Sequence, residues 1–92
     1  MTTSPEITLP TIHLNGTSRE ALVDMYEAAV RALYDAAEAL DMSAPNGRDY
    51  YTHATADALS KASAEHRSRV ARLAGIRLEL EALRDHALGD CP

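Results

Sequence analysis

The sequence predicts an all-α protein: a two-helix antiparallel hairpin with a short first helix, a longer second helix and an extended N-terminal arm. Two long stretches, 18–41 and 55–88, repeat their apolar residues at helical spacing. The turn-forming triplet Pro45-Asn46-Gly47 separates them. The 92 residues contain no Phe and no Trp, so one hairpin buries little apolar surface, and we expect it to assemble as a homo-oligomeric helical bundle.

The predicted arm consists of residues 1–12. Pro10 excludes a regular central strand. Apolar side chains recur among polar ones, so one side of the arm can lie on a helical surface: Ile7, Leu9, Ile12 and Leu14. Two arrangements are open, because the arm can dock on its own helices or pack on a neighbouring subunit.

The first helix is expected at 18–41. Asn15-Gly16 turns the chain, and Thr17-x-x-Glu20 matches a capping box. The apolar positions step by four and three residues and form a seam of coiled-coil type: Leu22, Tyr26, Ala29, Leu33, Ala36 and Leu40. Three further apolar residues widen this surface and indicate more than one packing partner: Val23, Val30 and Tyr34.

The connector is expected at 42–54 and the second helix at 55–88, with Thr55 as N-cap and Gly89 as the stop. The inward seam of this helix contains nine residues: Leu59, Ala62, His66, Val70, Leu73, Ile76, Leu80, Leu83 and Ala87. A second line lies on a different face and is a candidate for close approach of another helix: Ala71, Gly75, Leu78 and Ala82.

Charge is unevenly distributed along the chain. The net charge of −5 argues against duplex nucleic acid as a partner. Residues 61–77, however, hold five cationic side chains and one carboxylate, which suits a small anionic ligand or an acidic partner. The single cysteine, Cys91, excludes a disulfide framework, and no apolar run is long enough to cross a membrane. We therefore expect a cytoplasmic protein without a membrane partner.

The stretch from Arg48 to Tyr51 is the leading candidate site. A hairpin needs only Pro45-Asn46-Gly47 to turn, so a guanidinium and two aromatic rings exceed what a connector requires. The guanidinium can bind phosphate or carboxylate oxygens in a bidentate manner, and the rings can stack on a base. The alternative is structural: Tyr50 and Tyr51 cap the end of the bundle while Arg48 pairs with Asp49.

Residues at the first turn form a second candidate, because a helix N-terminus offers free backbone N–H groups and hydroxyls to an anion: Asn15, Gly16, Thr17 and Ser18. His66 and Arg67 are added as helpers, although a histidine on an inward seam is more often a packed core residue. The two turns lie at opposite ends of a hairpin, so they can join in one site only between subunits.

Catalysis and cofactor binding find no motif in the sequence. There is no Gly-rich phosphate loop, no His pair at helical metal spacing and no serine elbow. We expect a non-enzymatic protein with no catalytic residues, no cofactor and no metal.

Three phrases of the chain are distinctive: Ile12-His13-Leu14-Asn15-Gly16-Thr17-Ser18, Pro45-Asn46-Gly47-Arg48-Asp49-Tyr50-Tyr51 and Glu65-His66-Arg67. They resemble those of a family of small helical proteins encoded by tailed phages and prophages, over most of residues 11–88. This chain departs from the family after the second phrase, where Thr52-His53-Ala54-Thr55 replaces a Pro/Gly-rich stretch. The resemblance implies a phage protein in the cytoplasm of an infected or lysogenic bacterium.

Small oligomeric helical proteins of phages include ones that sequester the nucleotide signals of bacterial defence. This chain is similar to them in size and helical content only. The functional hypothesis is therefore a homo-oligomeric phage protein that binds a small anionic, nucleotide-like ligand. The alternative is an interaction protein that inhibits or adapts a host or phage protein through an exposed helix face.

Overall fold

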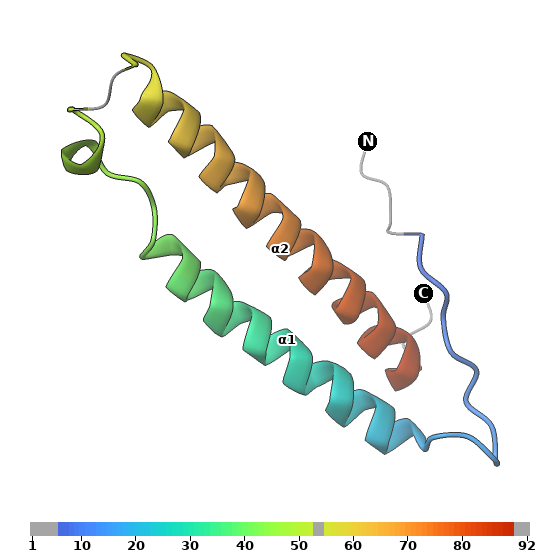
Figure 1. Ribbon diagram of the computed structural model, residues 1–92. Coiled ribbons are helices and arrows are strands. Elements are labelled where there is room, and N and C mark those ends of the chain that lie inside the picture. Colours follow the sequence, from blue (N-terminus) through green and yellow to red (C-terminus); the bar gives the residue numbers. More distant parts are fainter. Residues whose placement is uncertain (1–5, 53–54, 90–92) are drawn as a thin grey trace.

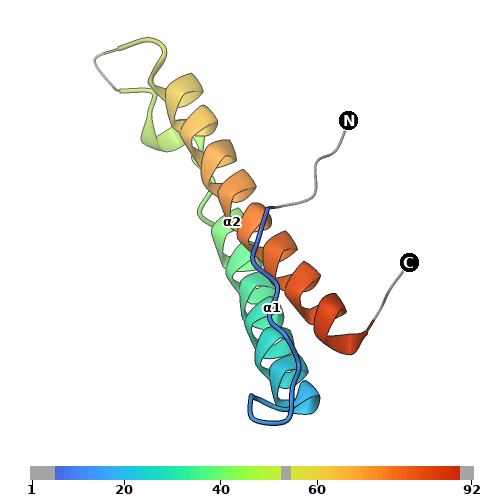
Figure 2. The ribbon, with the colours of Figure 1, turned by 90° about the vertical axis from the view of Figure 1, so that its right-hand side faces the viewer.

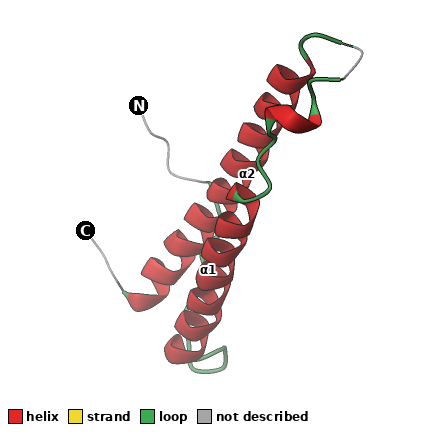
Figure 3. Ribbon diagram, turned by 90° about the vertical axis from the view of Figure 1, so that its left-hand side faces the viewer, coloured by secondary structure: helices red, strands yellow, loops and turns green. Residues whose placement is uncertain are grey.

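The computed structural model describes residues 6–52 and 55–89, which form two α-helices, α1 (Arg19–Asp41) and α2 (Ala58–Leu88), and one short 3₁₀ helix, η1 (Gly47–Asp49). The helices lie side by side and antiparallel in an elongated molecule of 62 × 28 × 20 Å (Figure 1). Outside the helices, the described chain consists of loops and turns without a strand (Figure 3). The prediction of an all-α protein with two packed helices is confirmed.

The N-terminus of α1 is capped by Ser18. Its backbone is extended, with φ −64° and ψ 156°, and its Oγ accepts a hydrogen bond of 3.1 Å from the backbone N–H of Ala21. The predicted capping box from Thr17 to Glu20 is therefore wrong by one residue. With Ser18 as N-cap, the third helical position is Ala21, whose methyl side chain cannot accept the hydrogen bond that completes a box.

The start of α2 differs from the predicted one, whereas its end agrees with the prediction. The helix begins at Ala58 instead of Thr55, because the backbone N–H of Ala58 bonds to the carbonyl of Thr55 in a turn, at 3.3 Å. Asp57 occupies the N-cap position without a side-chain cap. The helix ends at Leu88, and the predicted stop at Gly89 is confirmed by a left-handed φ of 80°, which glycine adopts without steric cost.

The contact between the helices is narrow, and its seam differs from the predicted one. Five described side chains are buried: Leu22, Val30, Ala58, Ala62 and Ala87. Val30, which was placed beside the seam, is 4% exposed, whereas Ala36 is exposed. On α2, Leu59 and Ile76 are 38% and 50% exposed. Alternating steps of three and four residues repeat every 3.5 residues, whereas an α-helix has 3.6 residues per turn. Along a nearly straight helix, residues chosen by such steps therefore rotate gradually out of the contact between the helices.

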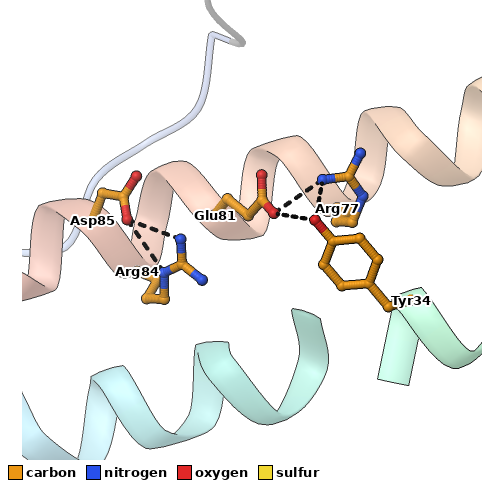
Figure 4. Close-up of polar contacts among 5 residues, drawn as sticks. All are labelled: Tyr34, Arg77, Glu81, Arg84 and Asp85. Carbon is orange, nitrogen blue, oxygen red and sulfur yellow. Dashed lines mark hydrogen bonds and ion pairs between the residues drawn. The ribbon is translucent and has the colours of Figure 1, made fainter. Parts of the chain in front are cut away.

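A polar cluster of Tyr34, Arg77 and Glu81 joins the helices near their middle (Figure 4). One guanidinium nitrogen of Arg77, Nη1, donates to the Tyr34 hydroxyl at 3.0 Å and to Glu81 Oε2 at 2.9 Å. The Tyr34 hydroxyl donates to the same carboxylate oxygen at 3.2 Å, and the guanidinium carbon lies 4.7 Å from the ring centroid. These directional contacts fix which turn of α1 lies beside which turn of α2. In Figure 4, the neighbouring pair Arg84 and Asp85 lies one turn further along α2.

Residues 6–12, the described part of the arm, lie along the C-terminal half of α2 in both Figure 1 and Figure 2, and residues 1–5 of the predicted arm lie outside the described residues. The described part is held by a 2.8 Å hydrogen bond between His86 Nε2 and the carbonyl of Pro10, which requires the protonated nitrogen to donate. At the same end, Arg19 Nη1 donates to the carbonyl of Ala87 at 2.7 Å and satisfies one of the free carbonyls that end α2. In the single chain, the arm therefore docks on its own helix.

In the part of the chain that the structure describes, the second line of α2 faces no other helix. A Cβ added to Gly75 would meet no heavy atom within 4 Å outside the local helix backbone, and Ala71 and Leu78 are exposed. The predicted close approach of another helix therefore stays a prediction about contacts between subunits. Neither described helix is long and apolar enough to cross a membrane.

We predict that Ser18→Ala lowers the free energy of unfolding by about 1 kcal/mol, because it removes the side-chain cap of α1. Thr17→Ala is the matched control and should change it by less than about 0.5 kcal/mol. Urea titrations followed by circular dichroism measure both. A larger loss for Thr17→Ala than for Ser18→Ala would restore the original capping assignment.

Gly75→Ala should raise the free energy of unfolding by about 0.5–1 kcal/mol, because alanine favours the helix and its Cβ meets open space. The same titrations test this expectation. A destabilised Gly75→Ala variant would show that another chain approaches this face closely, as the small-residue line suggests.

Candidate functional site

The connector end of the hairpin exists because α2 extends beyond α1. The last residue of α1, Asp41, lines a groove together with Val70 and Leu73, so about the first three turns of α2 lie beyond the end of α1. The described part of the connector, residues 42–52, continues past the end of α1 beside them, as Figure 1 shows, and a Cβ on Gly47 would lie 3.8 Å from Leu59 Cδ2. The predicted site residues between Arg48 and Tyr51 therefore rest on the exposed start of α2.

Asn46 shapes the connector locally. Its backbone is extended, and its Oδ1 accepts a 2.8 Å hydrogen bond from the backbone N–H of Arg48. This side-chain bond starts η1, and the N–H of Tyr50 closes it by donating to the carbonyl of Gly47 at 3.1 Å. These hydrogen bonds hold Arg48, Tyr50 and Tyr51 together in one tight turn.

Tyr50 lies between two shallow depressions and lines both of them. The first, of about 290 Å³, is formed with Thr55, Ala58, Lys61, Ala62 and Glu65. The second, of about 280 Å³, is formed with Gly47, Tyr51, Thr55, Ala56 and Leu59. Tyr50 is half-buried, so its ring also covers the start of α2.

Tyr51 and Arg48 are the exposed members of the candidate site. Tyr51 is 81% exposed, so it does not cap the bundle end. The Nε of Arg48 lies 3.4 Å from Asn46 Oδ1, a long contact, and Arg48 forms no ion pair with Asp49. The structural alternative is therefore wrong for Tyr51 and for the pair of Arg48 with Asp49. An aromatic face and a cation, both accessible to solvent, lie three residues apart on one connector.

The residues predicted at the first turn lie at the other end of the molecule. Asn15, Gly16, Thr17 and Ser18 are all exposed, and the Ser18 hydroxyl already accepts the N–H of Ala21. Within one chain the structure does not bring this turn to the connector, as expected of a hairpin (Figure 1). The larger groove at this end, about 400 Å³, is lined by other residues: Leu9, Pro10, Thr11, Ile12, Arg19, His86 and Gly89.

His66 and Arg67 point in different directions from α2. His66 is half-buried and follows Ala58 and Ala62 at spacings of four residues, on the buried side of the helix. Arg67, the next residue, is exposed. Neither lines the two depressions at the connector.

Lys61 is the cation that sequence reasoning did not assign to the connector site. It lines the first depression, and its Nζ lies 3.5 Å from Asp57 in an exposed ion pair. Lys61 belongs to this site because the connector lies against the start of α2, an arrangement that the sequence pattern alone does not reveal. The described residues contain no group of three or more histidine, cysteine, aspartate or glutamate side chains that could hold a metal ion.

A scan of the sequence against models of protein families found no match, and neither did searches of curated proteins and of solved structures. The resemblance to small helical phage proteins therefore stays a prediction that depends on the quoted phrases.

We predict that Asn46→Ala accelerates hydrogen exchange of the Arg48 amide by roughly fivefold, because it removes a hydrogen bond with a net value of about 1 kcal/mol. Exchange measured by NMR should leave the amide of Val30, in the middle of α1, unchanged. Equal acceleration at both amides would mean that Asn46 supports the whole fold and not the local connector.

Proposed function

We propose that this chain is a non-enzymatic, homo-oligomeric binding protein whose connector end recognises a small anionic, nucleotide-like ligand. The observation that carries the proposal is the exposed ring of Tyr51 three residues from Arg48, whose guanidinium has no carboxylate partner among the described residues. Solvent-exposed rings and uncommitted cations bind ligands more readily than groups already engaged within the fold.

Three side chains, Arg48, Tyr51 and Lys61, would each contact a different part of the ligand. The planar guanidinium of Arg48 offers paired donors to phosphate oxygens. The face of Tyr51 offers a stacking surface to a base. Lys61, which lines the first depression, adds a second cation that can exchange its exposed partner Asp57 for a phosphate at little cost, because exposed ion pairs are weak.

The biological role that fits this chemistry is sequestration. A small protein that binds a nucleotide signal without converting it lowers the free concentration of that signal. The resemblance to phage-encoded helical proteins favours a signal of bacterial defence as the ligand. Asn15–Ser18, His66 and Arg67 are left outside the proposed site, since they line neither depression at the connector.

An interaction protein is the second candidate function. The observation in its favour is the number of large apolar side chains that are about half exposed along the helices, among them Met25 at 56% and Ile76 at 50%. Such a protein inhibits or adapts a host or phage protein and gains no thermal stability from nucleotides, whereas a ligand-binding protein does.

We predict that at least one member of a panel of linear and cyclic mono- and dinucleotides raises the melting temperature of the protein. Arg48→Ala should then weaken binding of that nucleotide by about 1.5–3 kcal/mol, and Tyr51→Ala by about 1–3 kcal/mol. Isothermal titration calorimetry measures both losses.

The matched control is Arg69→Ala, which removes the same charge from α2 about 12 Å along the axis from Lys61. It should keep the affinity within a factor of about three, a change of less than 1 kcal/mol. Full affinity in a folded double variant, Arg48→Ala with Tyr51→Ala, would contradict the proposed site. No stabilisation by any nucleotide would favour the interaction protein.

A further inference from the structure

The groove between the arm and the hairpin is a second cavity, at the end of the molecule opposite the connector. Its volume of about 400 Å³ falls within the range of small-molecule sites, about 300–1,000 Å³. Three separate segments line it: residues 9–12 of the arm, Arg19 at the start of α1, and His86 with Gly89 at the end of α2. Figure 1 shows that these segments meet at one end of the hairpin.

The arm supplies an apolar wall to this groove. Leu9 is 47% exposed, and Pro10 and Ile12 are half-buried, so all three keep apolar surface that a ligand can cover. The 2.8 Å hydrogen bond between His86 Nε2 and the carbonyl of Pro10 holds this wall against α2. The groove therefore depends on the docked arm.

Arg19 supplies a cation with free donors. Its Nη1 donates to the carbonyl of Ala87 at 2.7 Å. Among the described residues, its Nε and Nη2 form no hydrogen bond and its guanidinium forms no ion pair. A guanidinium carries five N–H donors in a planar fork, so the edge formed by Nε and Nη2 is open to a ligand. This edge matches the two oxygens of a carboxylate.

Gly89 leaves the space in which the guanidinium lies. A Cβ at this position would be 2.9 Å from Arg19 Nη1, too close for a side chain. The bond to the carbonyl of Ala87 then keeps the guanidinium over the end of α2. The fold thus places the cation before a ligand arrives, which lowers the entropic cost of binding.

The charges around the groove favour a ligand with one negative charge. No carboxylate side chain is found among the described residues that line it. The end of α2 does not call for a cation, because the N–H of Gly89 donates to the carbonyl of His86 at 3.0 Å and Arg19 donates to that of Ala87. A carboxylate balances the single charge of Arg19, whereas a phosphate monoester carries about −1.5 to −2 at pH 7.

We propose that this groove binds a small organic anion in which a carboxylate is joined to an apolar group. The carboxylate pairs with Nε and Nη2 of Arg19, and the apolar group lies on Leu9, Pro10 and Ile12. His86 is a positioning residue, because it acts through Pro10. The site shares no residue with the connector site, so the inference is independent of the proposed function.

A titration with octanoate tests the site in the unaltered protein, and octylamine, with the same chain length and the opposite charge, is the matched control. Amide shifts are followed by NMR on isotope-labelled protein. Octanoate should move the amides of Thr11, Ile12 and Gly89 in one saturable step and leave that of Tyr51 in place. Octylamine should bind at least about tenfold more weakly, because it repels Arg19. Equal affinity for both probes, no saturable shift, or shifts confined to other surfaces overturn the proposal.

Variants test the roles of the two polar side chains. Arg19→Ala should weaken octanoate binding by about tenfold or more. Arg31→Ala removes the same charge from an exposed position further along α1 and should change the affinity by less than about twofold. His86→Ala should also weaken binding, whereas His86→Gln, whose amide can donate to the carbonyl of Pro10, should keep most of the affinity.

Circular dichroism shows whether each variant keeps its helices. Full affinity in a folded Arg19→Ala variant, or an equal loss in Arg31→Ala, overturns the assignment of the carboxylate to Arg19. Unchanged affinity in His86→Ala would show that the docked arm is not a wall of the site, and it overturns the proposal as well. Should Arg19→Ala fail to fold, the comparison of octanoate with octylamine decides, since it uses no variant.

Discussion

The difference in length between the two helices is the constraint on which the rest of the structure depends. The α1 helix has 23 residues and α2 has 31. The Tyr34–Arg77–Glu81 cluster and the bond from Arg19 to the carbonyl of Ala87 align the helices near their middle and at one end. The surplus of α2 therefore lies entirely at its N-terminal end, where the connector has to cover it. The candidate site is a consequence of this mismatch.

The same pair of helices leaves the core thin. Two helices in contact bury one stripe each, and here much of that stripe is alanine, which removes little apolar area from water. The arm covers part of α2, held through His86, but the side of the hairpin opposite Tyr34 stays open. Met25 of α1 and Ile76 of α2 therefore keep about half of their surface in contact with water.

The features that could be predicted from the sequence are those that depend on residues close together in the chain. Helical periodicity identified both helices, and Gly89 marked the end of α2 because it combines helix termination with a left-handed backbone. The cap at Ser18 and the seam through Val30 were missed, since neighbouring hydroxyls and neighbouring apolar residues satisfy the same pattern. Tyr34 and Arg77, 43 residues apart, meet only through the packing of two helices. Lys61 lies at the candidate site only because the connector packs beside the start of α2.

The position of the connector separates ligand recognition from folding. The polar contacts between α1 and α2 involve Arg19, Tyr34, Arg77, Glu81 and Ala87, and neither Arg48 nor Tyr51 takes part in them. Changes at these two exposed residues therefore alter the chemistry of the surface at little cost to the fold. Tyr50 differs, because its half-buried ring lies against the start of α2. A ligand that contacts Tyr50 or Lys61 therefore touches the start of α2 directly, and its binding adds to the stability of the folded chain.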